Sequence, residues 1–356
     1  MEMKVFENQL YKEDVKYIAD LDLPWNLLKD SSILISGASG LVGSCLIDAI
    51  MHKNMTTSLN CKIYALGRNE EKTKERFQYC WDDDQFLFVS HDINLPLEIA
   101  GLDQIGYVLH MASNTHPVAY ATDPIGTVTT NIIGTYNMLE FAVNHNARRF
   151  AFASSNEIYG ENRGDTEFFD EHYCGYIDSN TMRAGYPESK RCGEALCQAY
   201  IKQKGMDIVI PRLTRSYGPT MLMNDTKAIS QFIRKGVAGE DIVLKSAGTQ
   251  YYSYTYVADA VTGLLTILLK GECGAAYNIA DESSDIMLKD LAIIIAQYSG
   301  KNVVFEIPDD VEKSGYSTAT KARLDGSKLK RLGWKMHYDM EMGLKRTIEI
   351  LKQELK

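Results

Sequence analysis

The stretch 33-ILISGASGLVG-43 decides the fold of this chain. Residues 33–36 form a short run of branched apolar side chains, which is typical of a strand buried on both faces. Gly37, Gly40 and Gly43 follow, and a helical pattern continues behind them. In this strand–turn–helix context the glycines permit a tight turn and close approach of a pyrophosphate to the helix N-terminus. The stretch therefore predicts a dinucleotide-binding turn, with a ligand-free glycine turn as the alternative.

Short apolar runs alternate with longer amphipathic segments along the next 170 or so residues. Such alternation indicates parallel strands joined by right-handed helical crossovers. The sequence therefore predicts an α/β protein with a Rossmann-type doubly wound parallel sheet. The further strands are expected at 62–66, 86–90, 107–111, 150–154 and 207–211, and the clearest helices at 41–53, 127–146 and 187–204.

Three regions are expected along the chain. Residues 1–30 precede the first strand and are predicted to form an N-terminal helical extension. Residues 31–211 should form the dinucleotide-binding Rossmann domain with the catalytic residues. After residue 212 strand and helix patterns alternate less regularly. Residues 212–356 are therefore predicted to form mainly a smaller C-terminal substrate-binding lobe, partly interleaved with the sheet.

Composition and charge exclude several classes of protein. The net charge of -9 argues against a nucleic-acid partner, which requires a basic face. The seven cysteines contain no CxxC pair, which gives no metal-binding spacing and is typical of a cytoplasmic protein. The N-terminus is too charged for a signal peptide, and no apolar run approaches the length of a membrane span. We therefore expect a cytoplasmic protein with neither a bound metal nor a membrane contact.

The residue after the second strand usually selects the cofactor, with an acid for NAD and an arginine for NADP. Here Gly67 takes the place of the acid and Arg68 follows it. The cofactor is thus predicted to be NAD or NADP, with Arg68 favouring NADP unless it is a solvated surface charge. Asp92, at the end of the third strand, is placed to meet the adenine, or else is a simple turn residue.

The segment 186-YPESK-190 places Tyr186 and Lys190 four residues apart at the start of a helical pattern, hence on one face. A phenol has a pKa near 10, and an adjacent ammonium together with a cationic nicotinamide would stabilise its phenolate. Tyr186 would then take the proton from an alcohol as hydride leaves. The polar segment 154-SSNEIYG-160, directly behind a predicted strand, belongs to the same candidate site.

With these motifs in order, the chain resembles the extended short-chain dehydrogenase/reductases of the nucleotide-sugar epimerase/dehydratase family. The resemblance covers roughly residues 31–335. It rests on GxxGxxG (37–43), HMAS (110–113), NIIGTYNMLE (131–140), SSNEIYG (154–160), YxxxK (186–190), PRLTRSYGP (211–219), YTYVAD (254–259) and LDGSKLKRLGW (324–334).

The resemblance implies an enzyme that acts on a nucleotide sugar through a 4-keto intermediate, and a homodimer formed through helices 127–146 and 187–204. It makes Ser155, Glu157, Tyr186 and Lys190 the catalytic residues, with Asn131 orienting the active-site helix. The implied cofactor-binding residues are Gly37, Ser39, Gly40, Leu41, Val42, Gly43, Arg68, Asp92, Ile93, Met111, Ala112, Ser113, Asn131, Tyr186 and Lys190. The implied substrate-binding residues are Ser113, Asn156, Arg183, Arg215, Asn224 and Tyr252.

The triplet Ser155-Asn156-Glu157 bears on the reaction. The 4,6-dehydratases of the family carry a pattern like Thr-Asp-Glu, and the amide of Asn156 cannot donate a proton as a carboxylic acid does. Simple 4-epimerases usually lack the carboxylate of Glu157. The nearest pattern is that of UDP-glucuronate decarboxylases, which the segments 174–191 and 217–225 also resemble. Arg183 in the first of these is a candidate anchor for an anionic group on the sugar, or else a surface arginine.

Three positions depart from the family pattern. Tyr252 replaces an arginine that binds phosphate and supports catalysis in decarboxylases, Arg215 replaces an asparagine, and Thr220 replaces an arginine. A relocated arginine at 215 would restore diphosphate binding. The alternatives to a decarboxylase are a nucleotide-sugar 4-epimerase and an NADPH-dependent keto-sugar reductase. The expected class is a lyase or isomerase of nucleotide-sugar metabolism, as in polysaccharide biosynthesis. Outside the enzymes, a non-catalytic dinucleotide-binding protein is the alternative.

Overall fold

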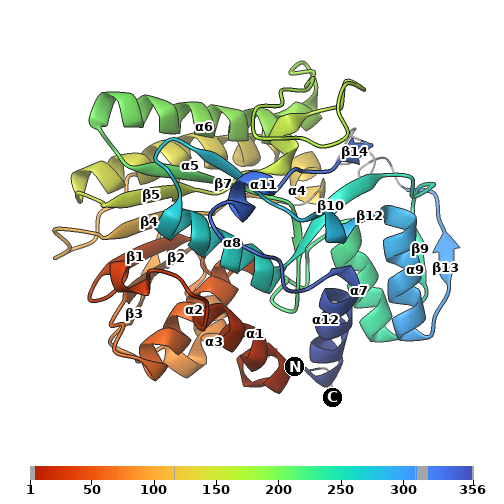
Figure 1. Cartoon of the computed structure of the whole chain (residues 1–356), viewed down its shortest axis with the longest axis horizontal. Coiled ribbons are helices and arrows are strands. Elements are labelled where there is room, and N and C mark those ends of the chain that lie inside the picture. The colour runs from red at the N-terminus through yellow and green to blue at the C-terminus, as the bar shows by residue number, and fades with distance from the viewer. Residues whose placement is uncertain (1–4, 116, 309, 311–319, 355–356) are drawn as a thin grey trace.

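An eight-stranded sheet forms the centre of the structure, a computed structural model that describes residues 5–115, 117–308, 310 and 320–354 (Figure 1). Parts of the expected extension (1–4) and C-terminal lobe (309, 311–319, 355–356) therefore lie outside the described residues. Every pairing in the sheet is parallel. In spatial order the strands are β11 (Ala276–Ile279), β7 (Ile208–Leu213), β5 (Arg149–Phe152), β4 (Tyr107–His110), β1 (Ser32–Ser36), β2 (Lys62–Gly67) and β3 (Phe86–Ser90), with the short β6 (Ser154–Ser155) also paired to β7.

This strand order confirms the predicted doubly wound sheet, because β1 lies at its middle and the chain winds outward in both directions. One expected strand differs from the structure. The run 150–154 divides at Ala153 into β5, which pairs with β4, and β6, which pairs only with β7. Ser154 and Ser155 lie beyond the last residue paired with β4, and both line the cavity of the candidate site.

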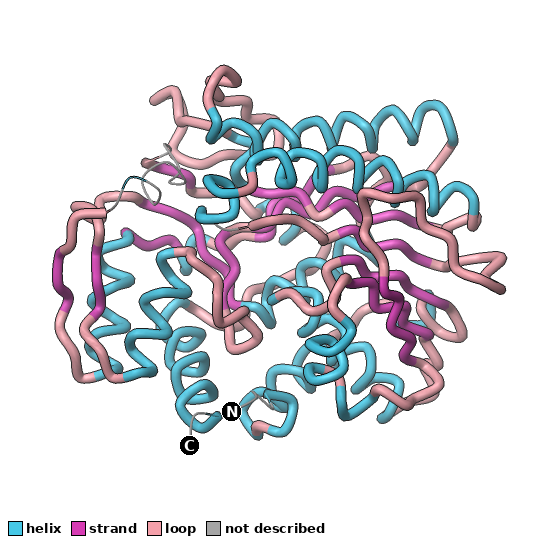
Figure 2. The backbone as a smooth tube through the Cα atoms, turned by 180° about the vertical axis from the view of Figure 1, so that it is seen from behind, coloured by secondary structure: helices cyan, strands magenta, loops and turns pink. Residues whose placement is uncertain are grey.

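Helices cover both faces of the sheet (Figures 1 and 2). α5 (Pro124–Asn144) and α6 (Gly185–Lys204) pack against each other on one face, while α2 (Leu41–Thr56) and α8 (Val257–Lys270) cover the other. Successive strand residues therefore enter different cores: Leu34 packs with the α5 side, and Ile33 and Ile35 pack with the α2 side. The predicted helices at 41–53, 127–146 and 187–204 are confirmed with small changes at their ends.

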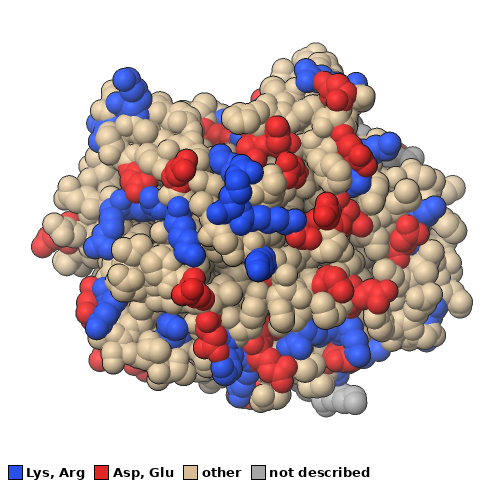
Figure 3. Space-filling model, viewed as in Figure 1, with Lys and Arg blue, Asp and Glu red and all other residues tan. Residues whose placement is uncertain are grey.

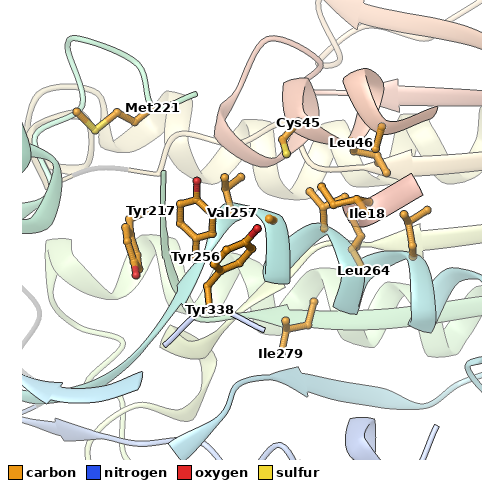
Figure 4. Close-up of a cluster of buried hydrophobic side chains, with 14 of the residues drawn as sticks. Ile18, Cys45, Leu46, Tyr217, Met221, Tyr256, Val257, Leu264, Ile279 and Tyr338 are labelled. Carbon is orange, nitrogen blue, oxygen red and sulfur yellow. The ribbon is translucent and has the colours of Figure 1, made fainter. Parts of the chain in front are cut away.

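The N-terminal extension contains α1 (Gln9–Ala19), which packs on α2 and α8. Figure 4 shows Ile18 of α1 among Leu46 and Leu264 of those helices. The buried carboxylate of Asp14 accepts hydrogen bonds from Tyr256 Oη at 2.6 Å and from Arg346 Nε at 2.9 Å. Because Arg346 lies on α12 (Met340–Glu354), this extension joins the first half of the chain to its end.

The remaining strands lie beside the central sheet and form the smaller lobe with α7 (Ala228–Ala238), α9 (Leu288–Ser299) and α12 (Figure 1). The division into domains at residues 211 and 212 stays a prediction, and β11 of the later half lies in the large sheet. One small sheet contains β8 (Arg215–Tyr217), β10 (Tyr251–Tyr256), β12 (Asp285–Met287) and β14 (Lys321–Ala322), and another β9 (Ile242–Leu244) and β13 (Val303–Phe305). The other described helices are α3 (Glu70–Arg76), α4 (Pro117–Thr122) and α11 (Ser327–Lys330), with 3₁₀ turns at η1 (Val5–Glu7), η2 (Trp25–Leu27), η3 (Gln78–Cys80), η4 (Asn156–Tyr159), η5 (Met182–Ala184) and η6 (Glu282–Ser284).

The surface carries mixed charge. On the face shown in Figure 3, acidic side chains lie among the basic ones. Within the described ranges, no helix is both long and apolar enough to cross a membrane. Over the same residues, no group of three or more His, Cys, Asp or Glu side chains is placed to hold a metal ion.

Candidate active site

A cavity of about 400 Å³ lies beyond the carboxyl ends of β1, β4, β6 and β7, where these strands meet the smaller lobe. This is where ligands bind in open parallel sheets. Among the residues named from the sequence, those that line it are Gly37, Gly40, Leu41, Val42, Gly43, Met111, Ala112, Ser113, Ser155, Asn156, Glu157, Arg183, Tyr186, Lys190, Arg215 and Tyr252. Six others, Ser39, Arg68, Asp92, Ile93, Asn131 and Asn224, are not among its lining residues.

The glycine turn allows a ligand to approach the backbone closely. Gly37 has a φ of 73°, and a Cβ there would lie 3.0 Å from the backbone nitrogen of Ala112. A Cβ on Gly43 would lie 2.3 Å from the carbonyl oxygen of Gly37, so only glycine allows α2 to start this close to β1. Gly40 is the N-cap of α2, and the helix N-terminus faces the cavity without a capping side chain. The turn therefore fits the pyrophosphate of a dinucleotide.

His110, which the sequence prediction did not include among the site residues, holds the ends of β1 and β4 together. Its Nδ1 lies 2.8 Å from Ser36 Oγ and its Nε2 lies 3.1 Å from Thr135 Oγ1 on α5. Burial, with a smaller contribution from the charge of Lys190, lowers the pKa of His110 to about 3. His110 is therefore a neutral positioning residue. The HMAS motif, which begins with it, was the available signal.

Asn131 connects three elements of the site although it lies behind the cavity. Its Oδ1 accepts a hydrogen bond from Ser113 Oγ at 2.7 Å, and its Nδ2 donates to Ser189 Oγ at 2.9 Å. Ser189 in turn donates to the carbonyl oxygen of Tyr186 at 2.8 Å. The fully buried Asn131 thus links the loop after β4 to the first turn of α6, which carries Tyr186 and Lys190.

Tyr186 lies in the cavity wall with 7% of its surface exposed. Burial raises its pKa to about 12, and the charge of Glu157 adds to the rise, while a hydrogen bond with Ser155 and the charge of Arg183 oppose it. Its ring stacks on Tyr120 with the centroids 4.8 Å apart. Tyr186 thus lines the same cavity as the serine and the carboxylate that the sequence predicted. The phenol needs further positive charge before it can act as a base near neutral pH.

Lys190 lies one turn further along α6 and is also buried. Its Nζ donates a hydrogen bond to the carbonyl oxygen of Ala153 at 2.9 Å and lies 4.9 Å from the ring centroid of Phe152. Burial lowers its pKa to about 8. The ammonium is therefore fixed at the break between β5 and β6, and its hydrogen bond goes to the backbone rather than to the Tyr186 phenol.

Glu157 and Arg183 form an ion pair in the cavity wall. Arg183 Nη2 donates to Glu157 Oε2 at 2.6 Å, and the exposed fractions of the two side chains are 14% and 19%. Glu157 lies on η4, directly behind Ser155, and Arg183 lies on η5, directly before α6. The Arg183 guanidinium also lies 4.8 Å from the ring centroid of Tyr120. Tyr120 thus contacts both Tyr186 and Arg183, although no sequence motif indicated it.

Arg215 and Tyr252 also line the cavity. The guanidinium carbon of Arg215 lies 3.5 Å from the centroid of the Tyr252 ring, in cation–π contact. The two residues come from the paired strands β8 and β10. The Nη1 atom of Arg215 is buried without a hydrogen-bond partner among the described residues. An arginine and a tyrosine far apart in the sequence thus form one unit beside the cavity.

The predicted residues outside the cavity lining have other surroundings. Arg68 is exposed, and the Asp92 carboxylate accepts a hydrogen bond from the backbone nitrogen of Asn94 at 3.0 Å. Ile93 is packed under α5, where Asn137 Nδ2 donates to its carbonyl oxygen at 2.8 Å. Asn224 is exposed, while the next residue, Asp225, faces the cavity. The cavity lining also includes charged residues that the sequence did not indicate, namely Asp225, Lys227 and Lys245.

Comparison with known proteins gives concordant results. The model of the NAD-dependent epimerase/dehydratase family matches residues 33–280. UDP-glucuronic acid decarboxylase 1 of Xenopus tropicalis is 32% identical over 327 residues, which cover 91% of this chain and 72% of the relative. UDP-glucuronic acid decarboxylase 3 of Arabidopsis thaliana is 31% identical over 317 residues, with 88% and 86% covered. Among solved structures, a dTDP-glucose 4,6-dehydratase mutant of Streptomyces venezuelae with bound NAD superposes with a TM-score of 0.78 at 22% identity, over 90% of this chain and 97% of that one.

Proposed function

This chain belongs to the NAD-dependent epimerase/dehydratase family, and from that membership we propose that it decarboxylates a nucleotide-linked uronic acid. In the proposed reaction C4 of the sugar is oxidised to a ketone, the resulting β-keto acid loses carbon dioxide, and the hydride is then returned to C4. The net change is therefore the loss of carbon dioxide alone. UDP-glucuronate is the proposed substrate, because the curated relatives named above are UDP-glucuronic acid decarboxylases.

The position of Glu157 is the observation that supports this reaction best. Its carboxylate lines the same cavity as Ser155 and Tyr186, and its charge contributes to the raised pKa of Tyr186. Its neighbour Asn156 also faces the cavity and carries an amide, which cannot act as the acid that expels a hydroxyl in a dehydration. Loss of carbon dioxide needs no such acid, since the electrons of the breaking bond pass to the C4 ketone.

The charge of the cavity fits a substrate with several negative charges. Its lining contains five basic side chains, Arg183, Lys190, Arg215, Lys227 and Lys245, against two acidic ones, Glu157 and Asp225. In a protein of net charge -9 this local excess of positive charge favours a nucleoside diphosphate sugar with a further carboxylate. We assign Ser113, Asn156, Arg183, Arg215, Asn224 and Tyr252 to substrate binding.

The dinucleotide would be held by the turn of Gly37, Gly40 and Gly43, with Lys190 beside the nicotinamide ribose. Bound NAD would supply the hydride acceptor for the oxidation at C4. Tyr186 would remove the proton of the C4 hydroxyl and later return it, while Ser155 Oγ hydrogen-bonds the same oxygen. Because the Tyr186 pKa is raised to about 12 by burial and by Glu157, the positive charge of the oxidised nicotinamide is needed to favour the phenolate.

The family description names NAD, and a preference for NADP is a separate proposal that rests on Arg68. Arg68 is exposed directly after β2, where its guanidinium is available to a 2′-phosphate. The remaining assigned cofactor residues are Ser39, Leu41, Val42, Asp92, Ile93, Met111, Ala112, Ser113 and Asn131. Of these, Leu41, Val42, Met111, Ala112 and Ser113 line the cavity.

The reaction is tested by incubating the protein with a panel of nucleotide sugars, with and without NAD or NADP, and analysing the products by mass spectrometry. We expect UDP-glucuronate to lose the mass of carbon dioxide. An unchanged mass with altered chromatographic mobility would instead establish a 4-epimerase. A gain of two hydrogens that requires NADPH would establish a keto-sugar reductase, and either result would overturn the proposal.

A homodimer formed through α5 and α6 belongs to the same proposal. The outer side of α5 exposes apolar residues, with exposed fractions of 43% at Ile133 and 49% at Tyr136. Such residues favour burial against a second copy of the helix pair. Sedimentation analysis of the purified protein is expected to show a dimer, and a monomer at all concentrations would exclude it. A cytoplasmic location stays a prediction.

A further inference from the structure

Arg215 differs from the other cavity cations whose partners the structure shows. Arg183 is paired with Glu157 at 2.6 Å, Lys227 with Asp225 at 3.0 Å, and Lys190 donates to a backbone carbonyl. Over the described residues, Arg215 has no carboxylate within ion-pair distance. Its buried Nη1 lacks a hydrogen-bond partner, which is costly for a charged group unless a ligand supplies the acceptor.

The two strands that carry Arg215 and its tyrosine hold the guanidinium in place. In the parallel pairing of β8 with β10, Arg215 stands opposite Tyr254, so its side chain lies on the same face of the sheet as those of Tyr254 and Tyr252. All three residues line the cavity. The Tyr252 ring, 6% exposed, lies against the guanidinium at 3.5 Å and keeps its plane fixed while its nitrogens stay able to donate. A fixed, planar donor is suited to a carboxylate, which accepts two parallel hydrogen bonds.

Arg215 also lies near the reacting part of the cavity. Arg215, Tyr252, Glu157 and Arg183 all line this cavity. Burial raises the pKa of Tyr252, the charges of Arg215 and Arg183 oppose the rise, and the charge of Glu157 adds to it. In a hexose whose C4 hydroxyl meets Ser155 and Tyr186, C6 is attached to the adjacent C5 and is therefore held close to the same part of the cavity. The diphosphate is attached at C1, across the ring from C4. Other cations in the same cavity can bind the diphosphate, namely Lys227 at the start of α7 and Lys245 directly after β9.

We propose that Arg215, held by Tyr252, binds the C6 carboxylate of the sugar and thereby selects a uronic acid over a neutral hexose. This inference rests on the proposed function and deepens it. It also differs from the sequence-based expectation that Arg215 restores diphosphate binding and that Arg183 anchors the sugar anion. Because Arg183 is neutralised by Glu157, Arg215 is the better counterion for the carboxylate.

The test measures binding of UDP, UDP-glucose and UDP-glucuronate to the NAD-loaded protein by calorimetry, in a Tyr186→Phe background that prevents turnover. Adding Arg215→Gln should weaken UDP-glucuronate binding by about 10- to 100-fold, the value of a charge-assisted hydrogen bond, and leave UDP and UDP-glucose within about twofold. Arg215→Lys should recover only part of the loss, since an ammonium lacks the planar fork. Arg331→Gln, which changes an exposed arginine outside the cavity lining, is the matched control.

The outcomes separate this inference from the proposed function. If UDP and UDP-glucose weaken as much as UDP-glucuronate, Arg215 binds the diphosphate and the inference is wrong while the proposed function stands. If no ligand weakens, Arg215 contacts none of them and the inference again fails. If the protein with intact Arg215 binds UDP-glucuronate no better than UDP-glucose, both fail. Tyr252→Leu should reproduce part of the Arg215→Gln effect, and Tyr252→Phe, which keeps the ring face, should weaken UDP-glucuronate binding less than Tyr252→Leu does.

Discussion

Arg183 donates a hydrogen bond to the carboxylate of Glu157 at 2.6 Å, across two segments that lie 26 residues apart in the sequence. The contact joins the segment behind β6 to the segment before α6, which are the two parts of the chain that carry Ser155 and Tyr186. Both partners are largely shielded from water, so each would be an uncompensated charge without the other. The pair therefore fixes where the carboxylate of Glu157 is located in the cavity wall.

This pairing predicts that substitutions of Glu157 and Arg183 have strongly non-additive effects on kcat/KM. Glu157→Gln and Arg183→Gln should each lower kcat/KM for UDP-glucuronate by about 10- to 100-fold, because each leaves one charge unpaired. The double variant should be no worse than Glu157→Gln alone, since no unpaired charge then remains. Losses that simply multiply would show that the pair does not act as a unit. The exposed pair Arg163 and Asp165, changed to Gln and Asn, is the control and should leave kcat/KM unchanged.

Removal of one hydroxyl should separate chemistry from cofactor binding. Tyr186→Phe is expected to lower turnover by about 10²- to 10⁴-fold, the usual contribution of a general acid–base group. The dinucleotide released on denaturation should stay at the amount found for the unchanged protein, because the ring still packs on Tyr120. Tyr298→Phe, on the surface of α9, serves as the comparison. Near-normal turnover of Tyr186→Phe would remove Tyr186 from the role of base.

The buried ammonium of Lys190 predicts that replacing this residue raises the stability of the protein but removes its activity. Its pKa is lowered to about 8 from an ordinary value of 10.5, so below pH 8 the folded state bears the cost of burying the charge. Between pH 8 and 10.5 the unfolded state binds more protons than the folded state, and wild-type stability gains with pH from this group. Lys190→Met should therefore be inactive yet melt at a higher temperature at pH 7, and the difference should shrink toward pH 10.5. A Tm of Lys190→Met below that of the wild type at pH 7 would contradict this account.

Cofactor choice can be tested at Arg68 without disturbing the cavity. If Arg68 binds the 2′-phosphate of NADP, Arg68→Gln should weaken NADP binding by about tenfold or more and leave NAD binding within about twofold. Equilibrium titration followed by tryptophan fluorescence provides both values on the same preparation. Equal, unchanged affinities would show that Arg68 is a solvated surface charge, in keeping with its exposure.

The sequence alone determined the fold and the placement of Tyr186 and Lys190 on one helix, because both depend on short-range patterns. The run 33–43 predicts strand, turn and helix from apolar periodicity and glycine spacing, and the structure places β1, Gly37 and α2 accordingly. Tyr186 and Lys190 share one face of a helix by their spacing of four, which holds wherever that helix packs. Glu157 likewise follows Ser155 within one turn, so both reach the same cavity.

Only the tertiary structure decided which of these groups neutralise one another. Tyr120 stacks on Tyr186, Arg183 pairs with Glu157, and Arg215 lies against Tyr252. Each partner comes from a separate segment with no periodic relation to the other, so composition and spacing carry no signal for the contact. Their meeting depends on how loops pack at the carboxyl edge of the sheet and on the register of β8 against β10. Packing therefore determines how the charges are distributed in the cavity. The local sequence determines which helix or strand carries each charged residue.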